Sequence, residues 1–166
     1  MRKIDTENWT VKAVKAGKHT HGYFFTGNLY CDARKVASFE EHGTGGPMDI
    51  YYLSDDVKSD FQSLANLIYE DDYPEADALL ISSMVDQYEF VKKVRRDRKK
   101  KTYFSVYDKS DDTNMESYVV NQPYSEKVVD MILKEDGNIV IANEEFDIYP
   151  DGVERVYREN KLNGGK

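Results

Sequence analysis

With 166 residues, 40% of them hydrophobic and 33% charged, the chain is long enough to form one domain with its own core. Its net charge of -8 argues against a protein that coats nucleic acid along its whole surface. No apolar run approaches the roughly 18 residues of a membrane span. A single cysteine excludes an internal disulfide, and the first residues lack the apolar run of a signal peptide. We therefore expect a cytoplasmic protein that does not bind a membrane.

Four runs of alternating residues predict an antiparallel β-meander in the first third of the chain. The runs cover residues 9–14, 23–31, 36–40 and 50–53. Alternation places Trp9, Val11 and Ala13 on one face of the first strand, and Gly17 is expected to end it. Asp32 and Ala33 are expected to form a two-residue turn, although glycine would suit the second position better.

Two helices are predicted to follow the meander. Ser54 is a good N-cap, and apolar residues recur at helical spacing over residues 57–68. Pro74 suits the first turn of the second helix, whose apolar stripe covers residues 80–91. This helix should end near Arg98, inside a basic segment.

The last third of the chain returns to alternating patterns. We expect strands over 103–107, 115–120 and 139–142, and a third helix capped by Ser125. These elements should complete the layer that the meander begins. The predicted class is α+β: an antiparallel β-meander packed on two to three helices, as a single domain over residues 1–158 with a disordered tail over 159–166.

Positive charge is concentrated in one segment. Residues 92–101 hold eight of the 23 basic residues, whereas the other 156 residues carry 15 basic and 30 acidic side chains. Such segregation creates a directional field, and the segment is a candidate phosphate contact with Tyr103 and Phe104 beside it to stack on a base. The alternative is a solvated helix end. The candidate nucleic-acid-binding residues are Arg95, Arg96, Arg98, Lys99, Lys100, Lys101 and Tyr103.

Negative charge gathers between Asp55 and Asp77. Carboxylates along a helix can mimic the phosphates of DNA and occupy a basic groove of another protein. They equally suit the positive end of a helix dipole, which is the structural alternative. The candidate partner-binding carboxylates are Asp55, Asp56, Asp60, Asp71 and Asp72.

The loop Gly43–Pro47 is the strongest break in the chain. Gly43, Gly45 and Gly46 are candidate contact residues, because backbone N–H groups in such a loop can surround an anion. The loop lacks the Lys-Ser/Thr ending of a P-loop. The alternative is a hairpin turn whose glycines are needed for positive φ angles.

Metal binding and catalysis have little support in the sequence. His19, His21 and His42 are the only histidines and are a loose zinc candidate, and Cys31 with a histidine is a loose nucleophile candidate. A small packing residue is the alternative for Cys31. Because no hydrolase, zincin or dinucleotide-binding signature is present, we expect no catalytic residue, metal or cofactor.

Several short stretches, taken in order, carry a family resemblance. They are Tyr23–Tyr30, Gly43–Pro47, Lys101–Phe104, Asn121–Ser125 and Ala142–Phe146. Together they resemble a group of small accessory proteins of tailed bacteriophages, over about residues 9–146, although Ala33 departs from the Asp-Gly turn expected there. The resemblance implies no known activity. It does imply a protein made in the cytosol of an infected bacterium, where small acidic proteins often block host defence enzymes.

Charge segregation without a catalytic signature predicts a non-enzymatic binding protein. Taken with the resemblance, it favours a phage-encoded protein that inhibits a host defence protein by occluding its working surface. The alternative is a nucleic-acid or nucleotide-binding module that uses residues 92–101. The sequence leaves the oligomeric state open.

Overall fold

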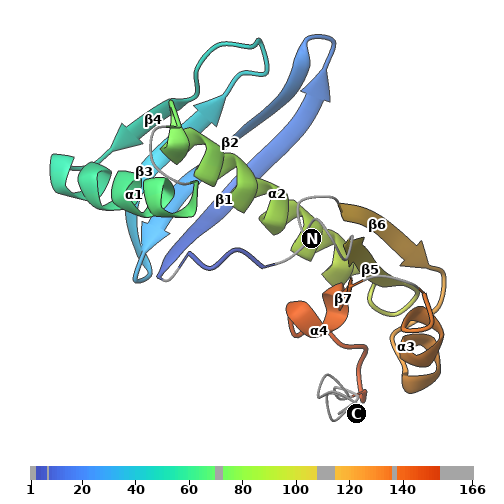
Figure 1. Cartoon of the computed structure of the whole chain (residues 1–166). Helices are drawn as coiled ribbons and strands as arrows, with labels where there is room; N and C mark the ends of the chain where they lie inside the picture. Colours follow the sequence, from blue (N-terminus) through green and yellow to red (C-terminus); the bar gives the residue numbers. More distant parts are fainter. Residues whose placement is uncertain (1–2, 7, 70–72, 108–114, 136–137, 154–166) are drawn as a thin grey trace. The chain divides into compact units, whose positions relative to one another are not determined.

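The structure, a computed structural model, describes residues 3–6, 8–69, 73–107, 115–135 and 138–153 (Figure 1). The chain divides into two compact units. The N-terminal unit is Ile4–Glu89, and the C-terminal unit is Phe90–Lys166 with Met1–Lys3. The α+β class with an antiparallel meander is confirmed. The predicted domain end at residue 158 and the tail over 159–166 lie outside the described residues.

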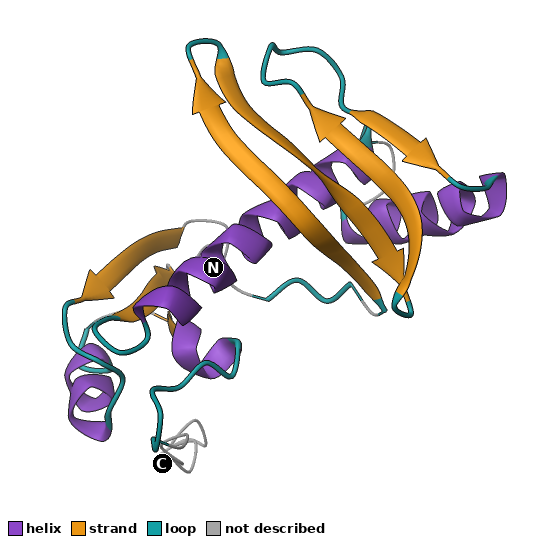
Figure 2. Cartoon of the chain, turned by 180° about the vertical axis from the view of Figure 1, so that it is seen from behind, coloured by secondary structure: helices purple, strands orange, loops and turns teal. Residues whose placement is uncertain are grey.

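The N-terminal unit is the predicted meander packed on helices. Its strands are β1 (Trp9–His19), β2 (Gly22–Cys31), β3 (Arg34–Glu41) and β4 (Asp49–Tyr52), in the order β1-β2-β3-β4 with antiparallel neighbours. Helix α1 (Asp55–Ile68) and the first part of α2 (Ala76–Asp97) lie on one face of this sheet (Figure 2). The core lies between them, with Leu29 and Phe39 from the sheet, Phe61 from α1 and Leu80 from α2 fully or almost fully buried.

Strand β1 differs from the prediction in two ways. It continues through Gly17 to His19, because the ring of Phe24 on β2 lies over Gly17 and replaces the missing side chain. A β-bulge also interrupts the pairing between Lys12 and Lys15. The extra residue reverses the alternation, so Val14 is buried while Ala13 is exposed with φ 55°.

The predicted turn at Asp32 and Ala33 and the predicted cap of the first helix are both confirmed. Asp32 and Ala33 have φ angles of 47° and 65°, as in the type I′ hairpin turn that twisted strands favour. Ser54 caps α1, and its Oγ accepts a hydrogen bond of 3.3 Å from the backbone N–H of Val57. Helix α2 begins at Ala76, so Pro74 precedes the helix and does not occupy its first turn.

The C-terminal unit has its own sheet, so the expected completion of the first layer is wrong. Its strands β5 (Thr102–Tyr107), β6 (Met115–Val120) and β7 (Asn138–Ile141) have the antiparallel order β6-β5-β7. Helix α3 (Glu126–Ile132) begins after the predicted cap Ser125, and Val128, Val129 and Ile132 are buried as expected for its core face. A short helix α4 (Ala142–Glu145) begins where the last strand was expected to continue.

Helix α2 contributes to the core of both units. Leu80, Ile81 and Val85 are buried in the N-terminal unit, whereas Val94 is buried in the C-terminal unit with Tyr103. Of the predicted apolar stripe over residues 80–91, the first residues pack in the N-terminal unit, whereas Val91 packs against the core that contains Val94. No helix in the described ranges is long and apolar enough to cross a membrane.

Candidate nucleic-acid interface

The basic residues lie at the C-terminal end of α2 and in the turn that leads to β5. We call this set the basic platform. It consists of Lys92, Lys93, Arg95, Arg96, Arg98, Lys99, Lys100 and Lys101, all in the C-terminal unit. Lys92, Arg95 and Arg96 share one exposed helix face at i, i+3 and i+4. Val94 is fully buried with Tyr103 and Ile148, so it holds this end of the helix on the core.

Asp97 organises the turn at the centre of the platform. Its Oδ1 accepts from Nε of Arg96 at 2.9 Å, and its Oδ2 accepts from the hydroxyl of Tyr103 at 2.6 Å. Its backbone carbonyl accepts from the N–H groups of Lys100 and Lys101, which ends the helix. The hydrogen bonds from Arg96 and then Tyr103 lower the pKa of Asp97 to about 2. This carboxylate is therefore charged at neutral pH and fixes the turn.

Asp151 is the second carboxylate at the platform. It accepts from Nζ of Lys99 at 2.7 Å and from Nη2 of Arg98 at 3.2 Å. These hydrogen bonds, the one from Lys99 first, lower the pKa of Asp151. Arg98 also donates from Nη1 to the backbone carbonyl of Arg95 at 3.1 Å, which caps the end of the helix. The sequence offered no signal for Asp151, because it is distant in sequence from the cations that it pairs.

The platform is only partly neutralised by the protein itself. Asp97 pairs with Arg96, and Asp151 pairs with Arg98 and Lys99. Among the described residues, Arg95, Lys100 and Lys101 form no ion pair with a carboxylate. The expected excess of positive charge is therefore present on the surface of the folded C-terminal unit.

The aromatic residues beside the platform do not have the exposure that base stacking requires. Tyr103 is 5% exposed and packs edge-on against Phe90, and the ammonium of Lys93 lies 5.2 Å from its ring centre. Phe104 is also buried, in the core that includes Tyr124. The two faces of β5 are covered by different cores, since Tyr103 packs with Val94, Ala142 and Ile148 and Phe104 packs with residues of α3. We therefore exclude Tyr103 from the proposed contact surface.

The acidic candidates lie in the other unit. Asp55, Asp56 and Asp60 are exposed on α1, and the first two lie in its first turn, where they favour the positive end of the helix dipole. Asp71 and Asp72 lie outside the described residues. Leu53 and Leu67, at 68% and 78% exposed, flank these carboxylates along the chain. Of the five candidate carboxylates the structure thus describes three, and all three lie in the first two turns of α1.

The glycines of the loop Gly43–Pro47 are explained by the backbone conformation of the turn. Gly43 and Gly45 have φ angles of 67° and 80°, and a side chain at Gly43 would come within 2.6 Å of the Tyr23 carbonyl oxygen. The N–H of Gly43 donates to the Glu41 carboxylate at 2.8 Å, so this donor already has a carboxylate partner. Gly46 is not in the left-handed region. The geometry supports the hairpin interpretation.

The histidines are close together but bond to the backbone and to carboxylates. Nδ1 of His19 accepts from the N–H of His21 at 3.0 Å, and its Nε2 lies 2.9 Å from the carbonyl oxygen of His42. His42 in turn lies 3.1 Å from Asp49. Within the described ranges, no group of three or more His, Cys, Asp or Glu residues has a metal-binding arrangement. Burial, and then Asp32 and Asp60, raises the pKa of Cys31, which disfavours its thiolate.

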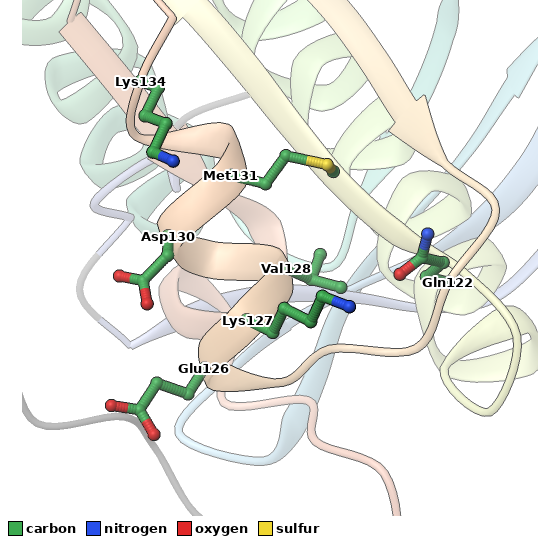
Figure 3. A pocket seen from close by; sticks show the side chains of 7 residues that line it. All are labelled: Gln122, Glu126, Lys127, Val128, Asp130, Met131 and Lys134. Carbon is green, nitrogen blue, oxygen red and sulfur yellow. The ribbon is translucent and has the colours of Figure 1, made fainter.

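A shallow hollow of about 490 Å³ lies beside α3 (Figure 3). Figure 3 shows Lys127, Val128 and Met131 projecting toward Gln122, whereas Glu126 and Asp130 project to the other side of the helix. The ammonium group of Lys127 therefore points away from both carboxylates, and Lys134 lies at the other end of the helix from Glu126. This arrangement does not bring an acid and a base together on a common ligand.

Comparison with known proteins identifies no relative: no family model, no curated protein and no solved structure matches the chain. The resemblance to phage accessory proteins stays a prediction. We therefore infer function from the geometry of the basic platform.

Proposed function

We propose that this chain is a non-enzymatic binding protein whose basic platform contacts the phosphate backbone of a nucleic acid. The observation that supports the proposal is the surface excess of cations at one end of α2, where Arg95, Lys100 and Lys101 form no ion pair with a carboxylate among the described residues. Cations on a polyanion release condensed counterions, which favours binding whatever the base sequence. The buried aromatic neighbours argue for backbone contact and against base recognition.

The proposal predicts weak, salt-sensitive affinity. If about five cations each neutralise one phosphate, the logarithm of the binding constant falls with the logarithm of salt concentration with a slope of about -4.5 for duplex DNA and about -3.5 for single strands. The dissociation constant is expected between about 1 and 100 µM at physiological salt. The acidic remainder of the chain, which gives a net charge of -8, opposes tighter binding.

Fluorescence polarisation with labelled single-stranded and duplex oligonucleotides over a salt series tests the proposal. Arg95→Glu with Lys100→Glu reverses two exposed cations that form no ion pair among the described residues, and should abolish measurable binding. The matched control is Lys15→Glu with Lys18→Glu on β1, which makes the same charge change in the other unit. Equal loss from both double variants, or no binding by the wild type, contradicts the proposal.

A second candidate function is occlusion of a host defence protein, the role first expected from charge segregation and the phage resemblance. It is supported by the acidic start of α1, where exposed Asp55, Asp56 and Asp60 follow the exposed apolar side chain of Leu53. An apolar side chain with charged residues around it is common at protein–protein interfaces. An affinity capture from bacterial lysate compares the wild type with Asp56→Lys/Asp60→Lys. A nuclease or other defence protein retained only by the wild type supports this candidate, and identical captures contradict it.

A further inference from the structure

Strand β6 is the edge strand of the described sheets with the fewest features that discourage further pairing. The edge strand β1 carries a bulge and the exposed lysines Lys12, Lys15 and Lys18, and β4 and β7 are only four residues long. Strand β6 has six residues, contains no Pro, Gly, Lys or Arg, has Glu116 as its one charged residue, and pairs with β5 without a register shift. Natural sheets usually protect such edges by charge, by bulges or by short length.

The side chains of β6 are exposed on both faces of its sheet. Residues 115–119 are all exposed, and they include Met115, Tyr118 and Val119 at 38%, 45% and 48%. Figure 1 places β6 at the outer side of the C-terminal sheet, as its order β6-β5-β7 requires. An apolar strand with a free edge and exposed faces is typical of a surface that pairs with another strand.

We propose that β6 pairs antiparallel with β6 of a second copy of this chain, about a two-fold axis at Ser117. Residues directly opposite each other in a sheet lie on the same face, so a two-fold axis normal to the sheet must pass through a pair of identical residues. The choice of central residue decides which side chains meet. The candidates are Glu116, Ser117 and Tyr118.

The pairing centred on Ser117, which we call the Ser117 register, gives the best match of side chains. It places Met115 opposite Val119 of the second copy, and Glu116 opposite Tyr118 of the second copy. A hydrogen bond between these two residue types already forms within one chain, where the Tyr118 hydroxyl donates to the Glu116 carboxylate. A Glu116 centre would oppose two like charges, and a Tyr118 centre would oppose Ser117 to Val119.

The Ser117 register also uses all five exposed residues of the strand and leaves out Val120, which packs on the core of its own unit. The result is a continuous sheet of six strands, β7-β5-β6 followed by β6-β5-β7 of the second copy. Its interface is isologous, which closes the assembly at two chains.

Cysteine crosslinking tests the register directly. In a Cys31→Ser background, Ser117→Cys places two thiols opposite each other, where antiparallel Cα atoms lie about 4.5–5.5 Å apart, within the range for a disulfide. Val119→Cys is the matched control, because its two copies lie about 13 Å apart along the strands. We expect a disulfide-linked dimer for Ser117→Cys, none for Val119→Cys, and a linked heterodimer when Met115→Cys and Val119→Cys chains are mixed. Equal crosslinking of the first two variants would overturn the register.

Sedimentation velocity from about 2 to about 200 µM tests the dimer itself, because its population follows mass action. Ser117→Lys and Ser117→Asp should each lower the dimer fraction by like-charge repulsion, and an equimolar mixture should restore it. That recovery separates repulsion from misfolding, because two misfolded chains would not rescue each other. Ser59→Lys on α1 is the control for an added surface charge. A monomeric wild type throughout the range, or equal effects of Ser117→Lys and Ser59→Lys, would overturn the proposal.

Discussion

The hydroxyl of Tyr103 donates a hydrogen bond of 2.6 Å to Oδ2 of Asp97 and so joins the first residues of β5 to the end of α2. Asp97 is at the same time the ion-pair partner of Arg96. One carboxylate therefore connects a buried aromatic ring to an exposed cation. This contact positions the turn from which Lys99, Lys100 and Lys101 project.

Replacing Tyr103 by Phe tests this contact through stability. The variant keeps the ring packing but loses one hydrogen bond to a charged group, so the free energy of unfolding should fall by about 1.5–3 kcal/mol. Denaturant titration followed by circular dichroism measures the loss. Tyr51→Phe is the control, because Tyr51 is 61% exposed and its change should stay within about 0.5 kcal/mol.

The same pair predicts a dependence on alkaline pH. Burial first, and then the hydrogen bond to Asp97, raises the pKa of Tyr103 from 10 to about 12. A group whose pKa is raised in the folded state contributes its stability fully below the unfolded value and loses it as pH rises through the folded value. The stability advantage of the wild type over Tyr103→Phe should therefore shrink between pH 10 and 12. A constant difference across this range contradicts the assignment.

Asp151 is predicted to weaken the binding of nucleic acid, since it pairs with Arg98 and Lys99. Asp151→Asn should raise affinity and steepen the slope of log binding constant against log salt by up to about 1.8 for duplex DNA, which is two more phosphates neutralised. Asp147→Asn is a matched control, because it removes one exposed negative charge from the same unit without releasing either cation. An unchanged slope for Asp151→Asn would mean that Arg98 and Lys99 do not contact phosphate.

Short-range features of the fold were predictable from the sequence. Ser54 as the helix cap, the turn at Asp32 and Ala33, and the basic end of the second helix each depend on neighbouring residues alone. The bulge after Lys12 was not predictable from alternation, because a strict period of two has no place for an extra residue. The only hint was Val14, an apolar residue on the face predicted to be polar.

The features that depend on distant residues were missed. Asp151 reaches the platform from beyond the last described strand, and Tyr103 is buried against Ala142 and Ile148, which are distant from it in the sequence. The division into two sheets was missed for the same reason: strand patterns do not reveal which strands pair. The charge of the candidate site was therefore predictable, but its internal neutralisation was not.

The turn at Asp32 and Ala33 predicts a stabilising substitution. Ala33 has φ 65°, a conformation that glycine adopts without steric strain, so Ala33→Gly should raise the free energy of unfolding by about 0.5–1 kcal/mol. Ala13→Gly should act in the same direction because Ala13 has φ 55° at the bulge. Ala16→Gly on the same strand has no positive φ to relieve and should destabilise by about 0.5–1 kcal/mol. A loss of stability in Ala33→Gly would contradict the turn geometry.

The glycine loop predicts a graded series of alanine substitutions. Gly43→Ala should be the most harmful, by about 3 kcal/mol, because it combines positive φ with a contact of 2.6 Å to a backbone oxygen that cannot move freely. Gly45→Ala has positive φ but open space around it, so about 1 kcal/mol is expected. Gly46→Ala has neither constraint and should be neutral within about 0.5 kcal/mol. Thermal or denaturant unfolding of the three variants gives the order, and a large loss for Gly46→Ala would show that the loop conformation is constrained by something other than its backbone.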